Sequence, residues 1–121
     1  MSEQENFFHL DALDQGISRS LAEGMSTRVF PGQQAMISIV RIDPNQAGEV
    51  HSHPQEQWGL CLRGSGVRLQ GGEEIAVGKG DFWRTPGGVE HGFRAGPEGA
   101  VIYDVFAPPR EEYTREGSGF S

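Results

Sequence analysis

Turn-forming residues interrupt this chain so often that strands are favoured over helices. Its 121 residues include 18 glycines and seven prolines, and no segment keeps an apolar period of 3.6 residues. Several short runs instead alternate polar and apolar side chains, as strands with one buried face do. Many short strands joined by tight turns are typical of a sandwich or barrel. The sequence therefore predicts an all-β fold.

The expected strands are separated by turn signals along most of the chain. They cover residues 17–30 (as short edge strands), 35–43, 57–64, 66–78, 80–88, 90–95 and 100–107. Inside the fourth stretch, Gly71-Gly72 suits the two-residue turn of a β-hairpin. The polar ends of the chain are expected to lie outside the core. We therefore predict a single domain over residues 1–121 with a core of about 26–107.

The charge of the chain limits its partners. Ten lysines and arginines against 17 aspartates and glutamates give a net charge of −7, which argues against nucleic acids and anionic membranes. No apolar stretch is long enough for a spanning helix, and the opening "MSEQENFFHL" lacks the basic and apolar regions of a secretory signal. The single Cys61 cannot form an internal disulfide, so a cytoplasmic location is expected.

Two histidines and a glutamine stand close together in the segment "EVHSHPQEQWG". Side chains on a strand alternate between its two faces with a period of two. His51, His53 and Gln57 are all odd-numbered, so an unbroken strand directs them to one face. Pro54 permits a bend between them. The spacing therefore predicts that three ligand-capable side chains converge on one point.

A fourth donor comes from a distant part of the chain. His91 follows a Pro-Gly-Gly turn that would return its strand toward the first motif. Three imidazoles with one amide oxygen suit Zn, Fe, Ni or Mn better than Ca or Mg. A lone His-x-His is often only a solvated strand edge, and His9 is given no role. Three of the four histidines in two such motifs favour a divalent transition metal, with His51, His53, Gln57 and His91 as its ligands.

The first motif resembles that of the cupin family. The family pattern is Gly, five residues, His-x-His, three or four residues, Glu, six residues and Gly. The spacing is kept here by His51, His53, Gln57 and Gly64. Asn45 stands in place of the opening Gly, and Gln57 replaces the usual Glu, which leaves the identity of the metal open.

The second motif resembles the other half of the cupin signature: Gly, five residues, Pro-x-Gly, two residues, His, three residues and Asn. Gly80, Pro86, Gly88 and His91 keep the spacing, and Ala95 replaces the Asn. The resemblance implies a double-stranded β-helix, the cupin β-barrel or jelly roll, commonly a homodimer. It also implies that the four predicted donors hold the metal.

A narrower resemblance involves the run "DVFAPPREEY". It is similar to small cupins of pectin and alginate degradation, which convert 4,5-unsaturated monouronates to their ring-opened keto form with a three-His, one-Gln metal set. In those proteins an Asp-x-Phe-x-x-x-Arg run lines the pocket, and here it reads Asp104, Phe106 and Arg110. Trp58 and Gly59 depart from these relatives.

Chemistry suggests a role for each residue of this run, with a small acidic molecule as the substrate. The Arg110 guanidinium suits bidentate capture of a carboxylate, Phe106 would close on the sugar ring, and Asp104 would move a proton. Each residue also has a structural interpretation. Asp104 could pair with an arginine, Phe106 could belong to the barrel core, and Arg110 could be a surface charge.

Two rival functions remain open at this point. The first is an Fe- or Ni-dependent dioxygenase that uses the same histidines, which an apolar pocket without a carboxylate-binding arginine would favour. The second is a non-enzymatic module that binds a small acid.

Further positions are assigned by parity. Trp58, Leu60 and Leu62 alternate with the ligands, so they are expected on the outer face of the sheet, against the N-terminal segment or a second subunit. Arg63 and Arg84 are candidate pocket cations.

Overall fold

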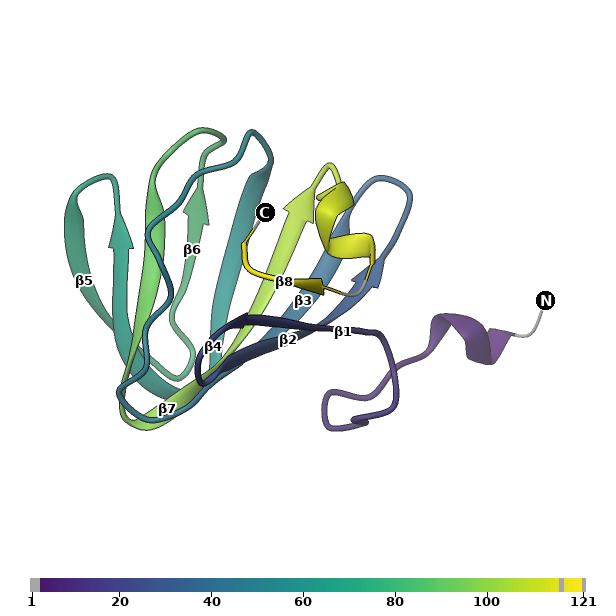
Figure 1. Ribbon diagram of the computed structural model, residues 1–121, viewed down its shortest axis with the longest axis horizontal. Helices are drawn as coiled ribbons and strands as arrows, with labels where there is room; N and C mark the ends of the chain where they lie inside the picture. The colour runs from purple at the N-terminus through teal and green to yellow at the C-terminus, as the bar shows by residue number, and fades with distance from the viewer. Residues whose placement is uncertain (1–2, 116, 121) are drawn as a thin grey trace.

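A single, strongly bent sheet makes up most of the molecule (Figure 1). The computed structural model describes residues 3–115 and 117–120. Its strands are β1 (Ile17–Ala22), β2 (Met25–Pro31), β3 (Met36–Ile42), β4 (Glu56–Gln70), β5 (Glu73–Gly78), β6 (Phe82–Thr85), β7 (His91–Ala107) and β8 (Gly117–Ser118). They lie in the order β5-β4-β7-β3-β2-β1-β8, with β6 paired to β4. The predicted all-β jelly-roll class is confirmed.

Within the residues that the structure describes, helical structure is limited to two single turns of 3-10 helix, η1 (Glu3–Asn6) and η2 (Glu111–Thr114). In Figure 1 the N-terminal segment extends away from the sheet, whereas the C-terminal segment crosses back over it. The described residues form no helix with the length and apolar character that a membrane crossing requires.

Two pairs of predicted strands are continuous in the structure. Residues 57–64 and 66–70 belong to one strand, β4, and residues 91–95 and 100–107 belong to another, β7. The register between β4 and β7 shifts between Cys61 and Arg63 and again between Gly64 and Gly66. Such bulges bend a strand without ending it, so the glycines taken as turn signals mark corners of the sheet. β4 and β7 therefore continue as single long strands past these corners of the sheet.

Shorter elements follow the predictions more closely. Gly71 and Gly72, both with positive φ, form the turn between β4 and β5, as the hairpin signal predicted. The predicted strands at residues 17–30 are β1 and β2, but β2 pairs with both β1 and β3 and is therefore not an edge strand.

The inner and outer faces follow the parity rule over the first half of β4. Gln57 and Cys61 are buried, whereas Trp58 is 43% exposed and Leu60 is partly exposed. On β6, Trp83 packs against the core and Phe82 is exposed. The outer face therefore carries aromatic side chains, as predicted. That a second copy of the chain covers them stays a prediction.

Met36 offers a direct test of core packing. It is 1% exposed and lies opposite Phe106 in the register of β3 and β7. Met36→Ala is expected to lower the free energy of unfolding by about 2–5 kcal/mol, because it removes buried apolar contacts and leaves a cavity. Ile75→Ala on β5, where the side chain is half-exposed, is the control and should stay within about 0.5 kcal/mol of the parent. Urea denaturation measures the free energy of unfolding of both variants. Equal losses in the two variants would contradict the assignment of Met36 to the core.

Candidate metal centre

A reciprocal pair of backbone hydrogen bonds places two of the predicted ligands side by side. The His51 amide donates to the His91 carbonyl at 2.9 Å, and the His91 amide donates to the His51 carbonyl at 2.8 Å. His91 begins β7, and His51 reaches it from the loop before β4 through this isolated bridge. The Pro-Gly-Gly turn thus returns the chain to the first motif, as the sequence predicted.

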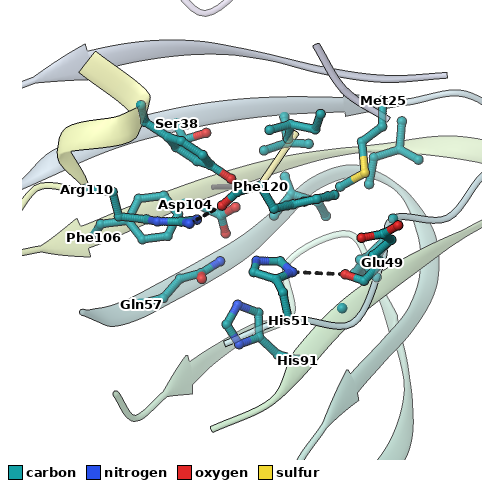
Figure 2. A pocket seen from close by; sticks show the side chains of 18 of the residues that line it. Met25, Ser38, Glu49, His51, Gln57, His91, Asp104, Phe106, Arg110 and Phe120 are labelled. Atoms are coloured by element: carbon teal, nitrogen blue, oxygen red, sulfur yellow. Dashed lines mark hydrogen bonds between the residues drawn. The ribbon is translucent and has the colours of Figure 1, made fainter. Parts of the chain in front are cut away.

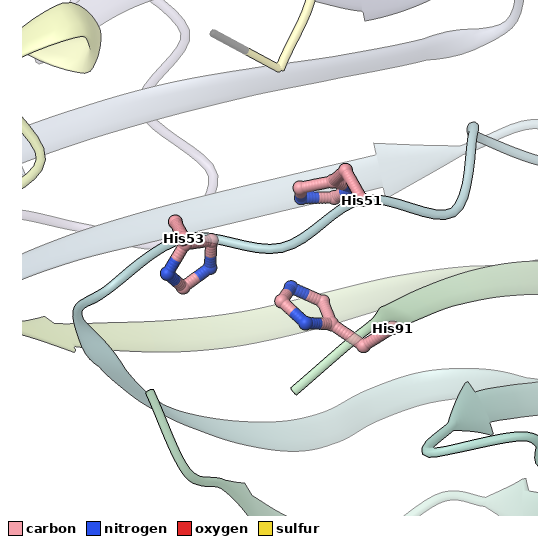
Figure 3. Close-up of side chains that lie close together, drawn as sticks. All are labelled: His51, His53 and His91. Carbon is pink, nitrogen blue, oxygen red and sulfur yellow. The ribbon is translucent and has the colours of Figure 1, made fainter. Parts of the chain in front are cut away.

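The third histidine is held by the same turn. The Gly88 amide donates to the His53 carbonyl at 2.8 Å. A side chain at Gly87 would collide with the carbonyl oxygen of Pro54, so glycine permits this close approach. Figure 3 shows the three imidazoles facing one another. Their ligand atoms all lie within 4.8 Å of one another, and the three residues are positioned for one metal ion.

Hydrogen bonds to backbone carbonyls fix the tautomers of two imidazoles. His51 Nδ1 lies 2.9 Å from the Glu49 carbonyl, and His91 Nδ1 lies 2.8 Å from the Val89 carbonyl. A carbonyl only accepts, so each Nδ1 carries the proton and each Nε2 keeps a free lone pair. His91 Nε2 is buried without a hydrogen-bond partner among the described residues, as a ligand atom aimed at a cation would be.

Burial also keeps these imidazoles neutral. It lowers the pKa values of His51 and His53, and it lowers that of His91 to about 3. The positive charges of Arg110 and Arg68 lower the pKa of His51 further. Neutral imidazole is the form that binds a metal, so the electrostatics of the site fit the predicted role.

Gln57 completes the predicted donor set. Its side chain is buried, and its Oε1 lies 3.0 Å from His53 Nε2. Two ligands at about 2.1 Å from one ion and at right angles to each other stand about 3.0 Å apart, so this spacing suits adjacent ligands.

Asn45, which replaces the opening Gly of the family motif, adopts φ 64°. Asn is among the few residues that tolerate this conformation, so the departure preserves the turn.

The residues of the Asp-x-Phe-x-x-x-Arg run lie in the same pocket as His51 and His91 (Figure 2). Asp104 is 7% exposed, and its Oδ1 has no hydrogen-bond partner within the described part of the chain. Burial raises the pKa of Asp104 to about 6, against the lowering effects of Arg68, Gln57 and Arg110. Phe106 is buried and meets the His53 ring edge-on at 5.4 Å between centroids. It therefore belongs both to the core and to the pocket wall.

Arg110 is buried rather than a surface charge. It is 2% exposed, its guanidinium lies 4.1 Å from the centroid of the Tyr113 ring, and its Nε donates to Glu112 Oε1 at 3.2 Å. Its Nη2 donates to the Phe120 carbonyl. Its Nη1 is buried and has no partner in the described residues. The geometry leaves a donor for an acidic ligand, while the catalytic roles of Asp104, Phe106 and Arg110 stay predictions.

Two arginines predicted as additional pocket cations lie outside the pocket. Arg63 is half-exposed and pairs with Asp11, its Nη2 lying 3.0 Å from Asp11 Oδ2, and Arg84 is exposed. The additional cation that does line the pocket is Arg68, which is 5% exposed. The bulge before Arg63 turns the odd-numbered side chains of β4 outward and the even-numbered ones inward. Arg84 lies opposite the exposed Trp58 in the register of β6 and β4.

The C-terminal segment is the other part of the pocket that the sequence did not reveal. Phe120 lines the pocket, and its ring centroid lies 4.4 Å from that of His51 (Figure 2). The space left inside the pocket is about 40 Å³, which is room for water but not for a sugar. The charge and aromatic content of this segment gave no signal of its position.

Comparisons with known proteins agree with this geometry. The curated relative oxalate decarboxylase OxdC from Bacillus subtilis is 32% identical over 91 residues, which cover 70% of this chain but only 24% of the relative. One solved structure of that enzyme is described by its Mn(II) centres. The chain thus spans about a quarter of the length of this curated relative.

Solved structures match over more of their length. An RmlC-like cupin from Shewanella frigidimarina has a TM-score of 0.76 and 23% identity, covering 88% of this chain and 96% of that chain. KdgF from Halomonas sp. has a TM-score of 0.73 and 23% identity, covering 78% and 88%. At this identity the likeness shows the fold. The family described as Cupin domain matches residues 38–106, more than half of the sequence, and the chain therefore belongs to the cupin family.

Proposed function

We propose that this protein is a metal-dependent cupin enzyme that ketonises a 4,5-unsaturated monouronate with opening of the sugar ring. The observation that carries the proposal is the buried Arg110, which lines the same pocket as Asp104, His51 and His91 and whose Nη1 has no hydrogen-bond partner among the described residues. A carboxylate is the ligand that a buried guanidinium prefers. The proposed substrate supplies one carboxylate next to the carbon–carbon double bond that reacts.

The reaction is an isomerisation in which one carbon–oxygen bond breaks and one proton is moved. One proton leaves the hydroxyl at C1, the bond between C1 and the ring oxygen breaks, and C1 becomes an aldehyde. The electron pair of that broken bond makes the ring oxygen a ketone at C5, and C4 takes up one proton. Since one proton leaves and one arrives, a single carboxyl group can accept the first and donate the second. Asp104 Oδ1, which is buried and unpartnered among the described residues, is assigned this role.

The remaining residues hold and shield the substrate. Arg110 would bind the carboxylate, and Phe106 would cover the apolar face of the ring beside His53. A divalent ion held by His51, His53, Gln57 and His91 would supply positive charge that stabilises an oxyanion. The four ligands are neutral, so none of them would offset that charge.

The similarity to oxalate decarboxylase supports a second candidate, in which the substrate is a small dicarboxylate. The 40 Å³ of free space in the pocket favours a small acid. The Asp104–Arg110 run, with its resemblance to the uronate-processing cupins, favours the monouronate. The dioxygenase alternative is less well supported, because the pocket contains two buried arginines.

Turnover assays separate these candidates. Metal-loaded protein is incubated with unsaturated galacturonate, unsaturated mannuronate and oxalate, and the loss of the ring enol absorbance or of oxalate is followed. We expect ketonisation of one uronate. Asp104→Asn should reduce its kcat by about 100- to 10,000-fold with the metal content unchanged, while Arg110→Met should mainly raise KM. Full activity in Asp104→Asn would remove that residue from the mechanism, and turnover of oxalate alone would favour the second candidate.

The metal centre is tested separately from the chemistry. His51→Ala is expected to weaken metal affinity more than about 100-fold, because changes to groups that merely support a ligand already weaken it by 10–100-fold. Elemental analysis after desalting, and competition with a chromogenic chelator, measure the effect. His9→Ala is the matched control, since His9 is exposed and lies outside the cluster. Equal metal content in both variants would contradict the proposed centre.

A further inference from the structure

Arg68 is a buried cation without a carboxylate partner. Its Nη2 donates to Thr85 Oγ1 at 2.8 Å and its Nε to Gln70 Oε1 at 3.3 Å, and its guanidinium lies 5.5 Å from the centroid of the Trp83 ring. Both hydrogen-bond acceptors are neutral. No ion pair joins it to any residue that the structure describes.

Arg68 belongs to the wall of the pocket. It lines the same cavity as His51, His91 and Asp104. Arg68 and Asp104 nevertheless lie too far apart for an ion pair within 4.0 Å, and Asp104 Oδ1 has no partner in the described chain. A hydroxyl group placed between them would donate to the carboxylate and accept from the guanidinium.

We propose that Arg68 binds the substrate hydroxyl whose proton Asp104 accepts, while Arg110 binds the carboxylate. This assignment rests on the proposed function and specifies the ligand further: an acid that carries a hydroxyl group at a distance from its carboxylate. The guanidinium stabilises the oxygen as its proton leaves. Its bonds to Thr85 and Gln70 hold it in place, so that no reorientation is needed when the ligand enters.

Two saturated acids distinguish the two arginines. D-galacturonate carries the carboxylate and the hydroxyls, whereas tetrahydropyran-2-carboxylate has the same ring and carboxylate without hydroxyls. Titration calorimetry on metal-loaded protein should show that Arg68→Met weakens galacturonate binding by about 10- to 100-fold and changes binding of the second acid by less than about threefold. Arg110→Met should weaken both. Arg94→Met, which alters an exposed arginine on β7 paired with Glu74, is the control and should change neither.

The outcomes separate the two proposals. Equal weakening of both acids by Arg68→Met, or no weakening of either, would overturn the role of Arg68 while leaving the acid site intact. Failure to bind either acid, in the parent protein and in Phe120→Ala alike, would overturn the acid site and the role of Arg68 together. Arg68→Lys keeps the positive charge but loses the planar guanidinium. It should therefore also weaken binding of galacturonate more than binding of the second acid, but by a smaller factor than Arg68→Met. Thr85 Oγ1 also donates to Gln70 Oε1 at 2.6 Å, a hydrogen bond that does not involve Arg68.

A second inference comes from an independent observation, the position of the segment 117–120, here called the strap. Arg19 holds it from β1: Nε donates to the Gly119 carbonyl at 2.9 Å and Nη2 to the Ser118 carbonyl at 2.8 Å. The Gly119 amide donates to the Ser20 carbonyl at 2.8 Å, and β8 pairs with β1. These contacts position Phe120 in the pocket (Figure 2).

Phe120 engages the groups that the proposed function assigns to metal and substrate. Its ring packs on the imidazole of His51 and its carbonyl accepts from Arg110 Nη2. With Phe120 in place about 40 Å³ is free, whereas pockets for small molecules usually measure about 300–1,000 Å³. We infer that the strap occupies the acid site and must be displaced before a monouronate binds. This inference also rests on the proposed function.

Variants that weaken the strap are expected to bind acid more tightly, because apparent affinity rises with the fraction of open protein. Phe120→Ala removes the ring, and Gly119→Ala strains the backbone at φ 81° while meeting no atom within 4 Å. Each should lower the Kd of D-galacturonate by about fivefold or more. Gly72→Ala introduces the same kind of strain at φ 84° in the turn between β4 and β5, and its Kd should match the parent.

Titration calorimetry on the metal-loaded proteins tests whether the strap must be displaced before an acid binds. A parent that binds acid, with strap variants that bind it no more tightly or more weakly, would overturn the inference and leave the acid site standing. Absence of binding in the parent and in both strap variants would overturn the acid site as well. Tighter binding in both strap variants but not in Gly72→Ala supports displacement of the strap.

Discussion

The two backbone hydrogen bonds between His51 and His91 are the contact on which the site depends. They join the loop before β4 to the first residue of β7, two segments 40 positions apart in the sequence. Because each residue both donates and accepts, the relative position of the two imidazoles is fixed by the main chain rather than by side-chain packing. The carbonyls of Glu49 and Val89 then set the ring tautomers, so the ligand atoms are oriented before any cation arrives.

A shortage of negative charge follows from this donor set. The predicted ligands are three imidazoles and one amide, and the same pocket contains two buried guanidinium groups but a single buried carboxylate, Asp104. The partly exposed Glu112 pairs with Arg110. A divalent cation would therefore leave an excess of positive charge, and buried charges are strongly unfavourable without partners of opposite sign. This excess is the physical reason for proposing an acidic substrate in a protein whose overall charge is −7.

Local sequence rules predicted the site where the backbone is regular and failed where it is not. The odd-numbered parity of Gln57 correctly placed its side chain on the inner face of β4, and the Pro-Gly-Gly turn correctly returned His91 to His51. The bulge before Arg63 reverses the parity of β4, so Arg68 was missed and Arg63 was wrongly considered for the pocket. The position of Phe120 depends on Arg19, 101 residues earlier in the chain, and no local pattern encodes such a contact.

The position of the strap and the charge imbalance of the pocket both follow from the buried donors that line the pocket. A pocket with buried donors aimed inward is unstable unless something accepts from them. The Phe120 carbonyl accepts from Arg110, and the ring covers His51, so the strap supplies part of what a ligand would supply. The neutral carbonyl satisfies hydrogen bonding, and Glu112 pairs with Arg110, but neither balances the charge of Arg68 or of a divalent cation. A carboxylate that displaces the strap would accept the hydrogen bond and also supply a full negative charge. This added charge is the reason that an acid would bind more favourably than the strap.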